Sequence, residues 1–368
     1  MAYTTDIFKN FKTRPDTQDG FFSEDEVRLA NRNAGTLLET LKHDITPTGL
    51  HYLLIHFDVP SLDASTHKLV FGDGFDAPYS LDIEEIRALP QLTRPVTLEC
   101  AGNGRTGLSP RTYSMPWSCE AVSTSEWTGT PLAPLIERAK PKAGTVEIAF
   151  TGADRGFDKG CEHAFGRSLT LEQIASLDIL LVHEMNGQPL LPQHGAPLRI
   201  IVPGWYGMAS VKWLSTIEAL STPYQGFQQV NTYRYREHKN DPGQPVTSIR
   251  VKSLMAPPGL PDWTTRLRYL RAGPVTVVGR AWSGDGTPIA KVEFSDGNHW
   301  QHAELTPPRG RYGWTRWTFD WEAVPGEHVL SCRATDSMGD TQPLEPRWDA
   351  SGFGNNAVQQ VRIYVDEA

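Results

Sequence analysis

Residues 95–107 read PVTLECAGNGRTG, and this stretch bears on both the fold and the chemistry of the chain. Its first part, 95–100, alternates in polarity and is rich in β-branched residues, which predicts a strand that ends at Cys100. Its second part holds three glycines, which let the backbone turn sharply and let a large ligand approach closely. The sequence therefore predicts a thiol held outward at the end of a strand.

The Cys100 thiol has a positively charged neighbour in Arg105, which favours the thiolate form. A thiolate at a rigid strand end is either a nucleophile or a metal ligand. A nucleophile needs a nearby base, and no histidine lies close by in the sequence. A soft metal, or a high-valent metal with sulfur ligands, fits better. The alternative is a buried structural cysteine, the default for this residue type.

Gly102, Gly104 and Gly107 also match the G-x-G-x-x-G spacing of dinucleotide-binding turns. Such a turn must lead into a helix whose N-terminus receives the pyrophosphate. Pro110 and a polar stretch follow here, and no amphipathic helix is predicted. We therefore reject the dinucleotide interpretation.

Two further segments contain charged or phenolic side chains that can bind a ligand. Residues 193–213, QHGAPLRIIVPGWYGMASVKW, place His194, Arg199 and Lys212 around a glycine-proline turn. Three potential cations at such a bend indicate an anion site, for example for a phosphate, and surface charge beside turn glycines is the alternative. Residues 225–236, QGFQQVNTYRYR, form either an exposed edge strand or a segment that lines a polar pocket with a phenol.

The 368 residues suffice for two domains. The 35 Lys and Arg against 43 Asp and Glu give a net charge of -8, which argues against nucleic-acid binding. No apolar run is long enough to span a membrane, and residues 1–20 show no export signal. We expect a soluble cytoplasmic protein, with a leader missing from the sequence as the open alternative.

The four cysteines, at 100, 119, 161 and 332, include no C-x-x-C pair, so disulfides are not expected. Cys161 and His163 match no usual zinc spacing, so a zinc site there is not expected either.

The pattern of elements predicts an α+β protein. Residues 1–33 read as a polar arm, with a short helix from near Glu24 towards 42, and residues 34–243 as a mixed α/β domain. From 244 to 368 turn-separated strands predict an immunoglobulin-like β-sandwich. Strands are expected at 50–59, 67–71, 95–100, 178–185, 198–202, 274–282, 289–295, 314–321, 327–335 and 357–365. Helices are expected at 131–140 and 168–177 and after a cap at Ser80, and a hairpin turn at Asn186-Gly187.

Taken together, these segments resemble the sulfite oxidase family of molybdenum enzymes, over about residues 34–368. The most specific stretches are LECAGNGR at 98–105, HEMNGQPL at 183–190 and VPGWYGMASVKW at 202–213. The resemblance implies a molybdopterin-binding catalytic domain of the sulfite oxidase fold, followed by an immunoglobulin-like dimerisation domain.

The resemblance also implies roles for single residues. Cys100 is expected to bind molybdenum, with further sulfurs supplied by the dithiolene of a pyranopterin. Tyr233 falls where the family places its active-site tyrosine, and Arg105 and Trp117 match the wall of the substrate pocket. The positions that match those holding the pterin and its phosphate are His56, Asp154, His194, Arg199, Ser210 and Lys212.

Three positions depart from the family pattern. Leu54 and Ser351 stand where family sulfite oxidisers carry arginines, and Ala209 replaces an arginine beside the phosphate site. Each lost guanidinium removes charged hydrogen bonds of about 1.5–3 kcal/mol. The cofactor cradle therefore matches the family better than the substrate pocket does.

From the resemblance we expect a molybdenum-cofactor oxidoreductase that oxidises sulfite to sulfate by oxo transfer at molybdenum bound to Cys100. One alternative is the same centre acting on an S-oxide or nitrate, which Leu54 and Ser351 favour; another is a non-catalytic molybdopterin-binding protein. Without a C-x-x-C-H motif we expect no haem, so electrons pass to oxygen or to a separate carrier such as a cytochrome. A homodimer through the second domain is the expected assembly.

Overall fold

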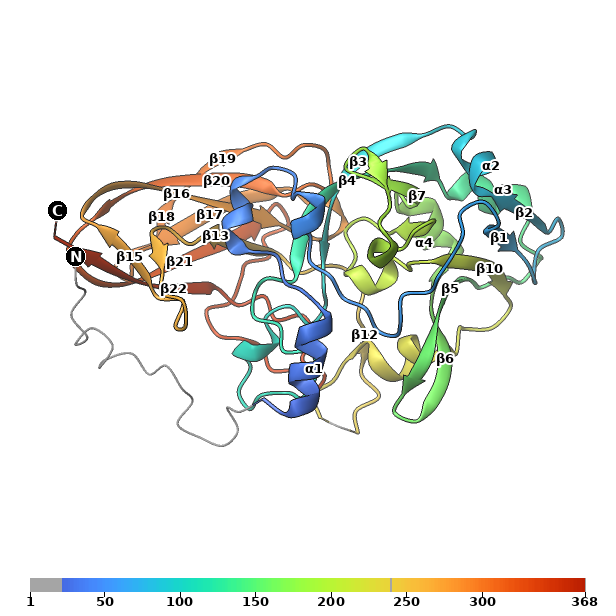
Figure 1. Cartoon of the computed structure of the whole chain (residues 1–368), viewed down its shortest axis with the longest axis horizontal. Helices are drawn as coiled ribbons and strands as arrows, with labels where there is room; N and C mark the ends of the chain where they lie inside the picture. Colours follow the sequence, from blue (N-terminus) through green and yellow to red (C-terminus); the bar gives the residue numbers. More distant parts are fainter. Residues whose placement is uncertain (1–21, 239, 368) are drawn as a thin grey trace.

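The chain folds into two β-rich domains that lie side by side (Figure 1). The structure, a computed structural model, describes residues 22–238 and 240–367. The predicted α+β class is confirmed, since short helices accompany many strands. Most of the predicted arm, residues 1–21, lies outside the described residues, and the boundaries expected at 33 and 243 stay predictions.

Helix α1 (Glu24–Arg32) begins where the sequence suggests a helix, but it does not continue towards residue 42. Ser23 and Glu26 form a reciprocal capping box, which satisfies two backbone donors at its start. The chain then becomes extended, and a separate 3-10 helix, η3 (Leu38–Lys42), follows. An ion pair of 2.5 Å between Arg111 and the fully buried Glu26 ties α1 to the loop after Cys100.

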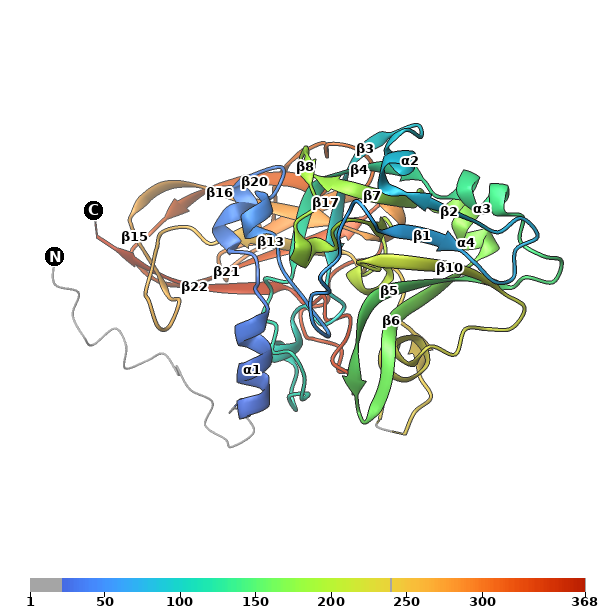
Figure 2. The same ribbon diagram turned by 45° about the vertical axis from the view of Figure 1, so that its right-hand side comes forward.

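The first domain contains two sheets. The order β3-β4-β7-β8 describes one sheet, with β9 also paired to β7, and β2-β1-β10-β5-β6 describes the other. β5 and β6 form a long hairpin that extends away from the rest of their sheet (Figure 2). The bounds are β1 Lys68–Phe71, β2 Tyr79–Asp82, β3 Leu92–Glu99, β4 Val122–Pro131, β5 Glu147–Asp158, β6 Cys161–Thr170, β7 Leu180–Met185, β8 Gln188–Pro189, β9 Arg199–Ile201 and β10 Leu214–Leu220.

Most of the predicted elements of this domain are confirmed within a few residues, including the turn at Asn186. Helices α3 (Ala133–Ala139) and α4 (Leu171–Ser176) are shorter than expected, because β4 continues through Pro131 and β6 through Thr170. The predicted cap at Ser80 is wrong. Asp82 caps α2 (Ile83–Arg87) instead, accepting a hydrogen bond from the Glu85 amide, while Ser80 lies in β2.

The strand predicted at 50–59 is also wrong, because this segment is an irregular extended stretch with a single bridge between Leu53 and Ala34. Side chains take over the role of a neighbouring strand. The Tyr52 amide donates to Ser123 Oγ, the Ile55 amide donates to Asn33 Oδ1, and the Leu54 carbonyl accepts from Lys212 Nζ. The segment is thereby free to follow the wall of a pocket.

The second domain is the predicted sandwich of two sheets, β13-β16-β20-β19 and β14-β15-β22-β21-β17-β18. Its core packs Phe294, Trp317 and Ile363, all fully buried. The five predicted strands are confirmed, and β13 shows that the proline-rich stretch at 254–261 begins inside a strand. The bounds are β13 Lys252–Ala256, β14 Leu260–Pro261, β15 Arg268–Arg271, β16 Gly273–Trp282, β17 Ile289–Ser295, β18 Gln301–His302, β19 Glu304–Thr306, β20 Thr315–Ala323, β21 Gly326–Asp336 and β22 Gln359–Asp366.

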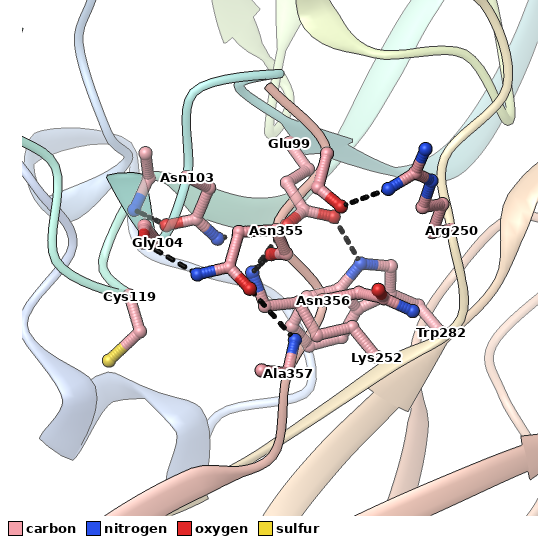
Figure 3. A network of polar contacts seen from close by, with 12 residues as sticks. Glu99, Asn103, Gly104, Cys119, Arg250, Lys252, Trp282, Asn355, Asn356 and Ala357 are labelled. Atoms are coloured by element: carbon pink, nitrogen blue, oxygen red, sulfur yellow. Dashed lines mark hydrogen bonds and ion pairs between the residues drawn. The ribbon is translucent and has the colours of Figure 1, made fainter. Parts of the chain in front are cut away.

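A buried polar network joins the two domains at Glu99, the residue before Cys100 in the sequence (Figure 3). Glu99, the last residue of β3, lies 3.1 Å from Lys252 Nζ of β13, and the two side chains are 2% and 3% exposed. The Glu99 carboxylate also accepts hydrogen bonds from Trp282 Nε1 and Asn103 Nδ2, at 2.8 and 2.9 Å. Lys252 in turn donates to the Asn355 carbonyl at 2.8 Å. The pair is therefore both neutralised and hydrogen-bonded.

Breaking one side of this pair leaves an uncompensated buried charge. We expect Lys252→Met to lower the free energy of unfolding by about 3–5 kcal/mol, and Glu99→Gln/Lys252→Met to recover part of that loss. Denaturant unfolding measures both. Arg28→Ala, which removes only exposed ion pairs on α1, serves as control and should cost under about 1 kcal/mol. Equal losses in Lys252→Met and the control would contradict the assignment.

Candidate functional site

A pocket enclosing about 670 Å³ not filled by protein atoms lies at the end of β3, inside the first domain. Nine of the residues singled out from the sequence line it, although they come from six separate parts of the chain. They are Leu54, His56, Cys100, Asp154, His194, Arg199, Ser210, Lys212 and Tyr233. Arg105 and Trp117 do not line this pocket.

One wall of the pocket is cationic. Arg199, at the start of β9, is 5% exposed and donates to the carbonyls of His194 and Ser210 at 2.9 and 3.1 Å. Its Nε finds no partner among the described residues. Lys212 Nζ donates to the carbonyls of Leu54 and Gln193 at 2.9 and 3.0 Å. Because carbonyls rather than carboxylates hold these cations, their charge is not neutralised locally.

Burial and the crowding of cations shift several pKa values in this wall. Burial and the nearby Arg199 guanidinium lower the pKa of Lys212 to about 7. Burial and the same guanidinium lower the pKa of His194 to about 4. Burial raises the pKa of Asp154 to about 6, although Lys212 opposes that shift. A wall whose cations disfavour one another is suited to an anionic ligand that would neutralise them.

Cys100 follows β3 directly and is 7% exposed. Burial raises the pKa of its thiol, and the Arg105 guanidinium opposes this shift without overcoming it. Arg105 therefore favours the thiolate, as its charge predicts, but burial of the thiol outweighs this effect. A thiol that coordinates a metal is deprotonated, so the raised pKa remains compatible with a metal ligand.

Arg105 and Trp117 lie beside Cys100 rather than in the pocket wall. Arg105 is 4% exposed and donates to the Met115 carbonyl at 2.7 Å, with its Nε unpartnered among the described residues. Trp117 is also 4% exposed. Its indole N–H makes no hydrogen bond within ordinary limits in the described part of the chain, yet it is near enough to lower the pKa of Cys100. Trp117 instead lines a second cavity of about 2160 Å³, open to solvent, between the domains.

Tyr233 and His56 both line the pocket, and their side chains contact each other. The Tyr233 hydroxyl lies 2.7 Å from His56 Nε2. Burial raises the pKa of the phenol, and burial together with the Lys212 charge lowers the pKa of His56 to about 3. Both groups are therefore neutral at pH 7. In the tautomer with the ring proton on Nε2, His56 donates to the phenol oxygen and leaves the phenol hydrogen free for a ligand.

Among the pocket residues that sequence reasoning missed are His51, Tyr52 and Phe165. His51 packs edge-on against His194, with ring centroids 5.4 Å apart, and Phe165 packs against His56 at 4.7 Å. The signal available for His51 and Tyr52 was the polarity of 51–56, which does not alternate as a half-buried strand should. Phe165 gave no signal beyond an apolar residue in a strand.

Unpartnered buried polar atoms gather around this pocket. Among the described residues, Asp154 Oδ1, Arg199 Nε and His51 Nε2 have no hydrogen-bond partner, although buried polar groups are normally paired. A polar, anionic ligand with donors and acceptors would satisfy all three, and a pterin phosphate is such a ligand. In the described part of the chain no cluster of three His, Cys, Asp or Glu side chains is placed to hold a metal ion. A metal at Cys100 would therefore need ligands that come with the cofactor.

Two family matches agree with this geometry. Residues 56–228 match the Oxidoreductase molybdopterin binding domain, and residues 245–366 match the Mo-co oxidoreductase dimerisation domain. The fold and the matches together define a molybdopterin oxidoreductase. More specifically, the chain belongs to the sulfite oxidase family.

Individual relatives span two activities. The chain is 30% identical over 347 residues to mitochondrial sulfite oxidase of Homo sapiens, covering 87% of this chain and 62% of that protein. It is 28% identical over 357 residues to nitrate reductase [NADH] of Ulva prolifera, covering 88% of this chain and 40% of that protein. The sulfane dehydrogenase SoxCD of Paracoccus pantotrophus shares the fold, with a TM-score of 0.77 and 22% identity over 100% of this chain and 96% of that chain.

The chain thus spans about two-fifths to three-fifths of the length of the sulfite oxidases and nitrate reductases it matches. No helix in the described residues is long and apolar enough to cross a membrane.

The lowered pKa of Lys212 predicts a pH effect on the cofactor-free protein. Between about 7 and the ordinary value of 10.5, the unfolded chain holds a proton that the folded protein lacks, so stability rises with pH. We expect Lys212→Met to flatten that rise between pH 7.5 and 9.5, by up to about 1.4 kcal/mol per pH unit. Urea unfolding at several pH values measures the slope. The exposed Lys142→Met is the control, and parallel curves for Lys212→Met and wild type would contradict the assignment.

Proposed function

We propose that the protein oxidises sulfite to sulfate with a molybdenum cofactor held at Cys100. The observation that carries the proposal is the single pocket in which the Cys100 sulfur, the cations Arg199 and Lys212, and the Tyr233 phenol converge. In the sequence, Cys100 lies 99 to 133 positions before the other three residues. A thiolate ligand, an anion cradle and a hydrogen-bond donor are the three elements that such an enzyme needs.

The residues divide into two functional sets. His56, Asp154, His194, Arg199, Ser210 and Lys212 would hold the pterin and its phosphate, and Cys100 would be the protein ligand of molybdenum. Arg199 and Lys212 offer charge-assisted hydrogen bonds to phosphate oxygens. The Ser210 hydroxyl is engaged as acceptor of the Val202 amide at 3.0 Å, so its own hydrogen remains free to donate.

When bound, the molybdenum cofactor supplies two-electron oxo transfer. The chain supplies binding, orientation and exclusion of water. Tyr233, neutral because it is buried, donates a hydrogen bond to an oxygen of the substrate, and His56 fixes the phenol orientation through the 2.7 Å contact. Arg105 contributes positive charge next to Cys100 from a water-free position, where electrostatic interactions are strong.

The test is to purify the protein from a host that makes the cofactor, measure molybdenum per chain, and assay sulfite with an artificial electron acceptor. Near-stoichiometric molybdenum with sulfite turnover supports the proposal. Molybdenum without sulfite turnover would contradict the substrate, and an absence of molybdenum would contradict the site.

Replacing the proposed metal ligand separates cofactor binding from folding. We expect Cys100→Ser to keep the wild-type unfolding midpoint within a few degrees, because the substitution is small, but to lose sulfite turnover by at least 100-fold. Metal analysis, circular dichroism and turnover are measured on the same preparation. Cys332→Ser, a buried cysteine of the second domain, is the matched control and should retain activity. Full activity in Cys100→Ser would refute the site.

A second candidate function is reduction of nitrate or an S-oxide at the same centre. It is favoured by Leu54, which lines the pocket at a position where sulfite oxidisers are expected to carry a guanidinium. An apolar side chain there attracts a dianion less strongly. Turnover of nitrate or dimethyl sulfoxide with a reduced dye, in the absence of sulfite turnover, would select this alternative.

The Leu54 position tests which anion the pocket favours. We expect Leu54→Arg to lower the KM for sulfite several-fold, because a guanidinium adds charged hydrogen bonds to an oxoanion. Steady-state kinetics over a range of sulfite concentrations measures it. Leu54→Met, similar in volume but neutral, is the control. An unchanged KM in Leu54→Arg would mean that residue 54 does not face the anion.

The second domain supports a further element of the proposal. Because residues 245–366 match a dimerisation domain, we propose a homodimer formed through this domain. Electrons would leave to a separate acceptor, a cytochrome or oxygen, and activity with each distinguishes the two.

A further inference from the structure

Arg167, on β6, is a buried cation that the functions assigned above do not use. It is 4% exposed, and its Nη1 donates to the Gln228 carbonyl at 3.1 Å. Its Nε has no hydrogen-bond partner, and it forms no ion pair, among the residues described by the structure. A buried guanidinium without a counter-charge is costly, because desolvation is not offset by attraction. An anion that binds nearby would offset this cost.

Arg167 lies next to two pocket residues, Phe165 and Tyr233. Phe165 and Arg167 are two residues apart on one strand, so their side chains leave the same face of β6. Phe165 lines the pocket and packs against His56. The Arg167 guanidinium lies over the Tyr233 ring, 5.6 Å from its centre. Arg167 is therefore directly behind the phenol that faces the pocket.

The acidic groups around Arg167 are already engaged. Glu147 acts on Arg167 from beyond ion-pair distance, and its carboxylate accepts from Ser168 Oγ and the Tyr224 amide at 2.6 and 2.9 Å. Asp158 accepts from Gln228 Nε2 at 3.3 Å. The charge of Arg167 is thus left to act on Tyr233 and on whatever binds beside it. Consistent with this, Arg167 opposes the rise in the pKa of the phenol that burial causes.

The Tyr233 side of the pocket lacks the two arginines that the family resemblance implies at positions 54 and 351. Residue 54 is leucine, and Ser351 accepts a hydrogen bond from Arg236 Nη1 at 3.2 Å instead of presenting a cation itself. Arg105 lies further away, beyond Phe353, which stacks on Tyr233 with ring centroids 5.1 Å apart. Among the described residues, Arg167 is the buried cation that lies over the Tyr233 ring.

We propose that Arg167 is a positioning and specificity-determining residue, which makes the Tyr233 side of the pocket attractive to a small oxoanion by acting from behind the phenol without touching the anion. The proposal rests on the proposed function, since it assumes that the substrate binds beside Tyr233. It deepens that function by assigning the attraction of the oxoanion to a residue of the β5–β6 hairpin.

The test uses the cofactor-loaded protein, in which the proposed phosphate cradle is filled, and sulfate as the probe in calorimetric titration. We expect Arg167→Gln to weaken sulfate binding at least 10-fold, and Arg167→Lys, which keeps the charge, to weaken it by less than about threefold. Arg155→Gln removes an exposed arginine of the same hairpin, paired with Glu162, and should change nothing. Sulfite kinetics should show the same order in KM, with smaller changes in kcat.

The outcomes separate this inference from the proposed function. Sulfate affinity that depends on Arg167, without sulfite turnover, supports the inference and contradicts sulfite as the substrate. Sulfite turnover with sulfate affinity unchanged in Arg167→Gln contradicts the inference alone. No sulfate binding by the wild type, or equal losses in Arg167→Lys and Arg167→Gln, also overturns it. If Arg167→Gln does not fold, Arg167→Met, which keeps the apolar stem, takes its place in each comparison.

Discussion

The carboxylate of Glu99 links the two domains at the residue that precedes Cys100. Its oxygens bind Lys252 and Trp282 of the second domain and Asn103 of the turn that follows β3. The turn is fixed from the other side as well, because Asn355 Nδ2 donates to the Gly104 carbonyl at 2.7 Å. The sulfur is therefore held by contacts from both domains. This arrangement gives the second domain a part in the geometry of the site, in addition to the dimerisation that its family match indicates.

The positive charges of the pocket are held by backbone carbonyls. Arg199 and Lys212 are held by backbone carbonyls, which orient a cation without neutralising it. Asp154, the acid that acts on Lys212, is itself desolvated, and burial raises its pKa. The cost of burying these charges is offset when an anion binds, so the site is stabilised by its ligand. A bound anion would also offset the cost of burying Arg167, although Arg167 lies behind Tyr233 rather than in the pocket wall.

The family assignment and the substrate rest on different parts of the molecule. The six residues proposed to hold the pterin and its phosphate meet in one pocket. On the proposed substrate side, Leu54 and Ser351 stand where the resemblance implies guanidiniums. Arg105 is buried over the Phe353 ring, and Arg167 is buried over the Tyr233 ring. A shift in where the charge lies would alter how the pocket discriminates among oxoanions without altering the cofactor chemistry.

The sequence by itself determined the α+β class, the sandwich strands and the stretch 95–107, because period-two patterns and glycine turns are local signals. Through a resemblance over about residues 34–368, it also predicted which residues hold the pterin and its phosphate. Only the tertiary structure decided that 50–59 is not a strand, that burial outweighs Arg105 at Cys100, and that polar residues of β4 such as Ser123 and Thr124 are fully buried. The reason is physical: desolvation, side-chain partners for backbone groups and the position of Arg167 behind Tyr233 all depend on residues distant in the sequence, which no local pattern records.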